Sequence, residues 1–136
     1  MLNQVDFPLT NSQISEFILD KGYTTYFKLQ QALSELLESG FIREESTHHR
    51  TFYHLTEDGA ETIHYFTNDI SPAIQHDIDE FLKEKHYELK NEMSVKADYF
   101  ENSNMEYSVR CQVIEQGLPL IDLTVTAPTE SEAATI

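Results

Sequence analysis

Apolar residues recur at helical spacing between Thr24 and Ile42, in the stretch TTYFKLQQALSELLESGFI. The apolar stripe consists of Leu29, Ala32, Leu33, Leu36 and Leu37. Thr24 or Thr25 offers a hydroxyl that can accept a hydrogen bond from the first turn of a helix. Gly40 stands where a helix end favours a left-handed residue. The pattern predicts an amphipathic helix over residues 24–40, followed by an extended segment.

A shorter apolar pattern precedes this helix. Pro8 ends the mixed N-terminal segment, because the residue before proline avoids the α region. Thr10 or Asn11 can then cap a helix over residues 12–20. The buried stripe of that helix is Ile14, Phe17 and Ile18, and we expect Leu33 and Leu36 to be buried against it. Residues 21–23, Lys-Gly-Tyr, form a short turn, so the two helices together predict a helix-turn-helix.

Two runs rich in aromatic and β-branched residues follow the second helix. They cover residues 41–43 and 51–55, and a polar stretch over 44–50 separates them. This pattern predicts a β-hairpin, which would be the wing of a winged helix-turn-helix. Its tip offers side chains suited to phosphate contact, Thr47, His48, His49 and Arg50, whereas Glu44 and Glu45 oppose such contact.

Two further helices are predicted after the hairpin. Thr56 can cap a helix over residues 57–68, which we expect to bury Ile63 and Phe66. Ser71-Pro72 starts the next helix, because proline fits the first helical position. Its apolar stripe runs to about residue 85 and consists of Ile74, Ile78, Phe81 and Leu82.

The period changes from helical to alternating near Tyr87. Alternation over residues 93–100, 107–113 and 121–126, with turns at 102–104 and 116–119, predicts a three-stranded antiparallel meander with one apolar face. Such a sheet needs a helix against that face. Thr129 and Glu132 match a capping box, so a helix begins there. Because the sequence ends at Ile136, we expect the natural chain to continue.

The predicted fold class is therefore α+β, a winged helix-turn-helix followed by helices and a three-stranded antiparallel β-meander. We assign residues 1–68 to the winged helix-turn-helix domain. Residues 69–136 hold a helix, the meander and the start of a C-terminal helix, a region for dimerisation or ligand sensing. The apolar stripe over residues 57–85 exceeds what a small wing domain covers, which predicts a homodimer. Its expected contacts are Phe66, Ile70 and Ile74.

A winged helix-turn-helix favours recognition of double-stranded DNA. Gln30 and Gln31 can pair with adenine in the major groove. Helix N-terminal amides near Thr25, together with Lys28 and Arg50, can contact phosphates. The full set of expected DNA-binding residues is Thr25, Phe27, Lys28, Gln30, Gln31, Ser34, His48, His49 and Arg50.

The charge of the chain opposes this interpretation. The formal net charge is −15, with 9 Lys and Arg against 24 Asp and Glu. DNA-binding proteins usually neutralise phosphates with Lys and Arg. The charge is uneven, since residues 1–55 carry −3 and residues 56–136 carry −12. The alternative function is a winged-helix protein-interaction module without DNA binding, and the simplest alternative for residues 24–40 is an amphipathic helix packed on a core.

The chain has the composition of a globular protein and one cysteine, Cys111, which excludes an intrachain disulfide. We expect Cys111 to be a small buried hydrophobe on the apolar face of the meander. No apolar run approaches the roughly 20 residues that span a bilayer, and the N-terminus has no signal-peptide pattern. We therefore expect a cytoplasmic protein with no membrane partner.

The sequence predicts no enzyme. It contains no Walker loop, no G-x-G-x-x-G and no G-x-S-x-G motif. The adjacent His48 and His49 point to opposite faces of a strand, which suits no single metal ion. We expect no catalytic residues, no metal and no cofactor, and the sequence identifies no small-molecule effector.

Several stretches of the chain resemble a family of winged-helix-like proteins from Gram-positive bacteria that is known only as a domain of unknown function, family 4364. The matching stretches are VDFPLTNSQISEFIL at 5–19, LQQALSELLESGFI at 29–42, TFYHLTEDG at 51–59, ISPAIQHDIDEFL at 70–82 and LIDLTVTAPTESEA at 120–133. The resemblance covers essentially the whole chain. It implies a winged-helix fold and, by analogy, transcriptional regulation. The chain departs from the family by lacking most of an apolar first helix before Val5 and the rest of the C-terminal helix.

Overall fold

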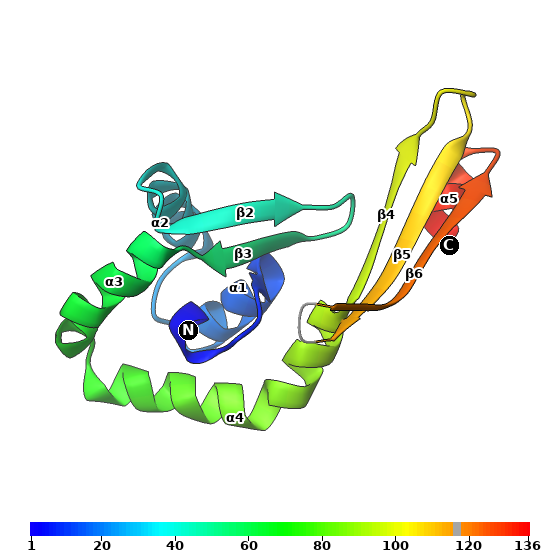
Figure 1. Cartoon of the computed structure of the whole chain (residues 1–136). Coiled ribbons are helices and arrows are strands. Elements are labelled where there is room, and N and C mark those ends of the chain that lie inside the picture. The colour runs from blue at the N-terminus through cyan, green and yellow to red at the C-terminus, as the bar shows by residue number, and fades with distance from the viewer. Residues whose placement is uncertain (116–117) are drawn as a thin grey trace. The chain divides into compact units, whose positions relative to one another are not determined.

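The computed structural model describes residues 1–115 and 118–136. The chain divides into two compact units, which Figure 1 shows with their helices and strands. The first unit comprises Met1–Ser46 and Arg50–Leu89, and the second comprises Thr47–His49 and Lys90–Ile136. The first unit therefore extends beyond residue 68, where the sequence pattern placed a boundary.

The first unit contains the expected helix-turn-helix and hairpin. Its elements in chain order are η1 (Leu2–Gln4), β1 (Leu9–Thr10), α1 (Asn11–Asp20), α2 (Tyr26–Glu38), β2 (Ile42–Ser46), β3 (Thr51–Leu55), α3 (Glu57–Phe66), η2 (Thr67–Asp69) and α4 (Pro72–Ser94), which continues into the second unit. The strands form an antiparallel sheet in the order β1-β3-β2. Strand β1 was not predicted, because two residues are too few to show a period.

The ends of the first two helices follow from local side-chain chemistry. Thr10 caps α1 in a capping box with Gln13, and Thr25 caps α2. Gly40 adopts φ of 73°, the left-handed conformation expected after a helix. These features confirm the predicted helix-turn-helix and place the start of α2 at Tyr26.

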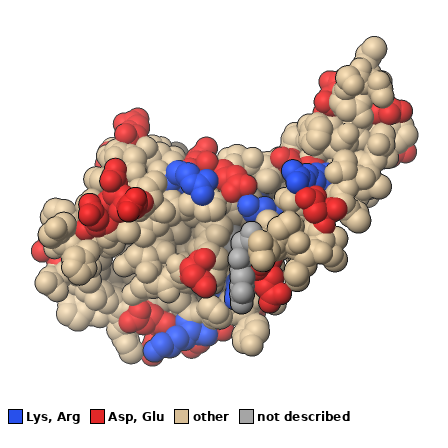
Figure 2. Space-filling model, viewed as in Figure 1, with Lys and Arg blue, Asp and Glu red and all other residues tan. Residues whose placement is uncertain are grey.

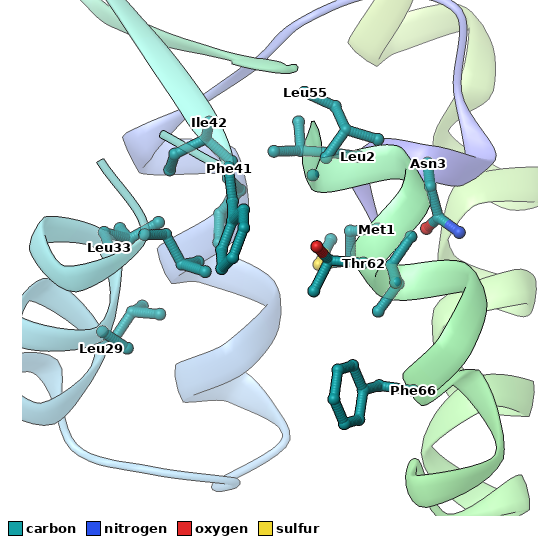
Figure 3. Close-up of a pocket in the computed structure, with 15 residues that line it drawn as sticks. Met1, Leu2, Asn3, Leu29, Leu33, Phe41, Ile42, Leu55, Thr62 and Phe66 are labelled. Carbon is teal, nitrogen blue, oxygen red and sulfur yellow. The ribbon is translucent and has the colours of Figure 1, made fainter. Parts of the chain in front are cut away.

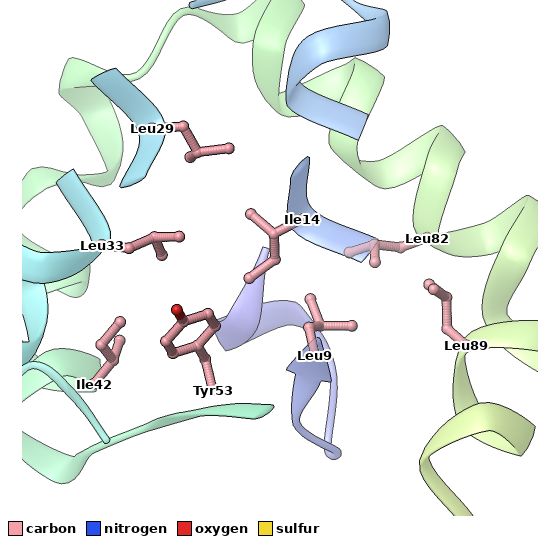
Figure 4. Close-up of a cluster of buried hydrophobic side chains, with 8 residues drawn as sticks. All are labelled: Leu9, Ile14, Leu29, Leu33, Ile42, Tyr53, Leu82 and Leu89. Atoms are coloured by element: carbon pink, nitrogen blue, oxygen red, sulfur yellow. The ribbon is translucent and has the colours of Figure 1, made fainter. Parts of the chain in front are cut away.

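The core of the first unit lies between α1, α2, the small sheet and α4. Figure 4 shows its buried side chains, Leu9, Ile14, Leu29, Leu33, Ile42, Tyr53, Leu82 and Leu89. Leu33 is 6% exposed, which confirms its predicted burial. Leu36 is 39% exposed, so the prediction that it packs with Leu33 against α1 is wrong. The reason is that the side chain of Leu36 lines a cavity between α2 and α3.

Helices α3 and α4 differ from their predicted forms. Phe66, expected to be buried, is 55% exposed at the end of α3. Helix α4 extends to Ser94 rather than ending near residue 85. Glu84, Lys85, Glu88 and Lys90 are good helix formers, and the Lys85–Glu88 pair lies on one helical face at 3.7 Å. These residues carry the helix through the segment in which the alternating pattern was expected to begin.

The second unit contains the predicted meander. It consists of β4 (Val95–Glu101), β5 (Tyr107–Glu115) and β6 (Leu118–Ala127), antiparallel in the order β4-β5-β6, followed by α5 (Glu130–Thr135). The turn expected at Gln116 and Gly117 lies outside the described residues. Thr129 caps α5 as predicted, and Ala133 of α5 packs on the sheet with Val109 and Ala127. Cys111 is half-buried beside this cluster.

Among the helices of the described residues, none combines the length and apolar composition that crossing a bilayer requires.

Candidate nucleic-acid interface

Helix α2 is held in the first unit by a polar network as well as by its leucines. The side-chain amides of Asn11 and Gln30 exchange two hydrogen bonds, of 2.8 and 3.1 Å. Asn11 also donates to the hydroxyl of Tyr53 at 3.0 Å and accepts from Ser15 at 3.0 Å. This network joins the start of α1, the middle of α2 and strand β3. It therefore fixes the orientation of α2 about its own axis.

Gln30 occupies a different position from the one that helical spacing suggests. It is half-buried, and its amide is engaged with Asn11 rather than directed outward. A side chain at the border of an amphipathic helix can turn to either side, and here a polar partner lies on the inner side. Gln30 thus positions the helix, and its amide is not presented for reading a base.

The remaining predicted residues of α2 lie on its exposed face. Phe27 is 84% exposed, and Lys28, Gln31 and Ser34 are also exposed. The amide nitrogen of Gln31 donates to Glu35 one turn later at 3.1 Å. At the N-terminus of the helix, Thr25 accepts a hydrogen bond from the backbone N–H of Lys28 at 3.4 Å. The structure thus brings Thr25, Phe27, Lys28, Gln31 and Ser34 onto one helix surface.

Tyr26 is a residue of this surface that the sequence pattern did not single out. It is 53% exposed, and its ring meets the ring of Phe27 edge-on with centroids 6.0 Å apart. The signal that could have identified it is its position directly after the capping threonine. The first turn of a helix that follows a tight turn projects outward on several sides.

The hairpin supplies few cations beside α2. Arg43 and Arg50 are exposed on or next to strands β2 and β3. Glu45 lies on the same hairpin and pairs with His54 across the strands at 3.0 Å. Glu44 is exposed as well. The hairpin thus offers both signs of charge to any ligand.

His48 and His49 belong to the second unit. The backbone N–H and the ring of His48 both hydrogen-bond to Asp98, and the ring stacks on Tyr99 with centroids 3.9 Å apart. Partial burial acts to raise the pKa of Asp98, but the hydrogen bonds from His48 and from the Tyr99 backbone lower it below its usual value. The ring of His49 lies 6.1 Å from that of Tyr99. The two histidines are thus engaged with β4 within the second unit.

Positive charge is sparse on the surface. On the face that Figure 2 shows, Lys and Arg side chains lie among Asp and Glu side chains and do not merge into one broad basic area. Within α2 itself, Lys28 is opposed by Glu35 and Glu38. A surface of this kind attracts phosphates weakly, because affinity for the DNA backbone grows with the number of phosphates neutralised.

An apolar cavity of about 320 Å³ lies in the first unit between α2 and α3. Figure 3 shows Leu29 and Leu33 of α2 on one side and Thr62 and Phe66 of α3 on the other. Phe41 lies in the lining between these helices. This cavity explains why Leu36 and Phe66 keep large exposed areas, since both side chains line it.

Among the described residues, no group of three or more His, Cys, Asp or Glu side chains converges as a metal site would require. The shifted carboxyl pKa values have structural causes at separate places. A hydrogen bond from Arg110 lowers the pKa of Asp122, and the bonds from His48 account for Asp98.

Comparison with known proteins identifies one family. A family model described as Domain of unknown function (DUF4364) matches residues 1–136. No curated protein and no solved structure matches the chain. The chain therefore belongs to the DUF4364 family.

Proposed function

We propose that this member of the DUF4364 family is a DNA-binding transcriptional regulator that reads the major groove with α2. One observation carries the proposal. The helix following a helix-turn-helix turn is fixed on its inner side by the Asn11–Gln30 network and leaves Phe27, Lys28, Gln31 and Ser34 on its outer side. A rigid helix with an exposed polar face is what insertion into the major groove requires.

The proposed roles follow from the chemistry of each side chain. Gln31 would read a base edge, because a side-chain amide can donate and accept at once with adenine. Ser34 would add one hydrogen bond to a base or phosphate. Lys28, together with the backbone amides capped by Thr25, would contact phosphates at the start of the helix. Arg43 and Arg50 would supply further phosphate contacts from the hairpin.

A protein-interaction module is the second candidate function, and a different observation favours it. Tyr26 and Phe27 form an exposed aromatic pair on α2, and the chain carries a net charge of −15. Aromatic residues are enriched where proteins bind one another, and an acidic surface repels DNA. In this case the same helix face would bind a protein partner. In neither case do we propose enzymatic activity or a cofactor, and we place the protein in the cytoplasm.

We also propose that the chain acts as a homodimer. Regulators with a helix-turn-helix commonly read two half-sites that a two-fold axis relates. The residues expected to form the dimer contact differ in how far they are exposed. Phe66 is exposed but lines the cavity, and Ile70 and Ile74 are half-buried.

The test of DNA recognition is a selection from random DNA duplexes at low salt, with the whole chain as bait. The expected result is enrichment of one sequence motif, and of a two-fold symmetric one if the dimer binds. In the same selection, the Gln31→Ala variant should enrich a motif in which the preference at one base pair is relaxed. Failure to enrich a motif, together with no binding at low salt, would favour the interaction module.

A further inference from the structure

Strand β6 is an unusually long sheet edge. It runs for ten residues, Leu118–Ala127, and every one except Ala127 is exposed. Figure 1 shows β6 as an outer strand of its sheet, and no strand among the described residues pairs with its outer side. An outer strand presents unpaired backbone N–H and C=O groups, so long apolar edges are templates for pairing with another chain.

The two edges of this sheet are protected very differently. The opposite edge, β4, carries the charged residues Lys96, Asp98 and Glu101, and charge on an edge strand discourages pairing. Strand β6 carries one charged residue, Asp122. Arg110 on β5 holds that carboxylate with two hydrogen bonds of 3.0 and 2.8 Å, which lower the pKa of Asp122. Apart from Pro119 near its start, the edge formed by β6 therefore lacks the protection that β4 has.

We propose that β6 pairs edge to edge with β6 of a second copy of this chain, antiparallel, about a two-fold axis perpendicular to the sheet. Such an axis keeps the two apolar faces on one side, since directly opposed residues of an antiparallel pair share a face. The proposal deepens the homodimer in the proposed function by placing its contact at β6 instead of at Phe66, Ile70 and Ile74, and it is independent of DNA binding.

Charge and strand length select the register. Asp122 opposite Asp122 of the second copy would place like charges side by side, which is unfavourable. Moving the axis by one residue places Leu123 opposite Leu123, Asp122 opposite Thr124 of the second copy, and Ile121 opposite Val125 of the second copy. This register pairs nearly the whole of β6 and opposes no two charges.

The pairing also improves the burial of the apolar face. Helix α5 covers only the end of the sheet around Val109 and Ala127. Leu123 and Ile121 remain exposed on the same face, although both are large apolar residues. In the proposed register each of them gains an apolar neighbour from the second copy, and such cross-strand pairs stabilise a sheet. A second copy thus fits both the backbone edge and the side chains of β6.

The first experiment measures the oligomeric state of the whole chain by sedimentation velocity across micromolar concentrations at moderate salt, without DNA. The wild-type chain should be a dimer. Thr124→Asp should raise the dimer dissociation constant about tenfold at low salt, because by symmetry two introduced carboxylates each oppose an Asp122. The effect should shrink at high salt. Thr124→Asn, equal in size and uncharged, should leave the dimer unchanged.

Thr124→Asp is compatible with the fold of the single chain, because Thr124 lies opposite the positively charged Arg110 in the β5–β6 ladder. Circular dichroism of both variants checks this. A monomeric wild-type chain would overturn the proposal. A dimer that Thr124→Asp does not weaken would overturn it too, since the second copy would then lie elsewhere, for example on the apolar face of the sheet.

The second experiment reads the register through disulfide formation in a Cys111→Ala background. Leu123→Cys should form a covalent dimer on mild oxidation, because opposed residues lie within disulfide range. Asp122→Cys alone and Thr124→Cys alone should not, whereas an equal mixture of these two variants should cross-link. Cross-linking of Asp122→Cys alone would contradict the register. DNA binding that fails while both experiments succeed would overturn the regulator and leave the dimer standing.

Discussion

The hydroxyl of Tyr23, in the turn between α1 and α2, donates a hydrogen bond to the carboxylate of Asp77 on α4. The ring of Tyr23 lies edge-on to Phe17, with centroids 6.0 Å apart, and Phe17 in turn packs against Phe81 of α4 at 4.7 Å. The turn that sets the direction of α2 is therefore tied to a helix more than fifty residues later in the chain. The hydrogen bond raises the pKa of Tyr23 to about 12.

This contact predicts a loss of stability at alkaline pH. A raised pKa means that the folded chain favours the protonated hydroxyl. The stabilisation is complete below the unfolded pKa of about 10 and is lost as pH rises toward the folded pKa of about 12. Urea titrations at pH 8 and pH 11 should show a smaller alkaline loss for Tyr23→Phe than for the wild type. Tyr65→Phe, at an exposed tyrosine, should behave like the wild type. Equal losses in all three proteins would contradict the assignment.

Leu33 and Leu36, two of the four leucines of α2, form a matched pair for testing the core. Leu33 is 6% exposed and Leu36 is 39% exposed. Leu33→Ala should lower the free energy of unfolding by about 2–5 kcal/mol, because it leaves a cavity in a packed core. Leu36→Ala should cost about 1 kcal/mol or less, because its side chain already borders an open cavity. Denaturant titration measures both, and the reverse order would show that the buried face of α2 is misassigned.

Gly59 in the first turn of α3 predicts a steric effect. A Cβ atom there would lie 2.0 Å from the backbone oxygen of Phe41, which cannot move aside as a flexible side chain could. Gly59→Ala should therefore destabilise the fold by about 3 kcal/mol or more, despite the higher helix propensity of alanine. Glu61→Ala, exposed on the same helix, is the control and should change stability little. A Gly59→Ala protein as stable as this control would mean that α3 does not pack on Phe41.

Periodicity predicts the elements of this chain better than it predicts their borders. The strong stripes of α1 and α2 and the alternation of the meander identify those elements, because each buries one face. The same stripes do not reveal the Asn11–Gln30 bond, since a border residue is oriented by a partner on another helix. They also assign Leu36 to the core, although α3 leaves a cavity beside it. Such errors arise where the position of a second element decides the outcome.

The neighbouring glutamines of α2 therefore predict two different mutant phenotypes. Gln30→Ala should reduce stability by about 1–3 kcal/mol, because it leaves the part-buried amide of Asn11 short of a partner. Gln31→Ala should leave stability nearly unchanged, because its side chain is exposed. If α2 reads DNA, Gln31→Ala should relax preference at one base pair. A stable Gln30→Ala protein with relaxed base preference would reverse the two roles.

If the chain binds DNA, the salt dependence of its affinity tests the proposed phosphate contacts. Lys28, Arg43 and Arg50 are the cations of α2 and the hairpin. Each phosphate that a cation neutralises adds about 0.9 to the slope of log affinity against log salt. Because α2 and the hairpin carry so few cations, the slope should be shallow. Lys28→Ala or Arg50→Ala should flatten the slope by about one per subunit and weaken binding to all DNA sequences alike.

The control for this prediction is Lys83→Ala, because Lys83 is exposed on α4, outside α2 and the hairpin. It removes the same charge, so it reports the effect of net charge alone. Its slope should match that of the wild type, and the affinity should fall only slightly through the longer-range field. Fluorescence anisotropy titrations between low and moderate salt give all the slopes. If Lys83→Ala flattens the slope as much as Lys28→Ala does, the attraction is a property of the whole acidic chain, and α2 does not make the phosphate contacts.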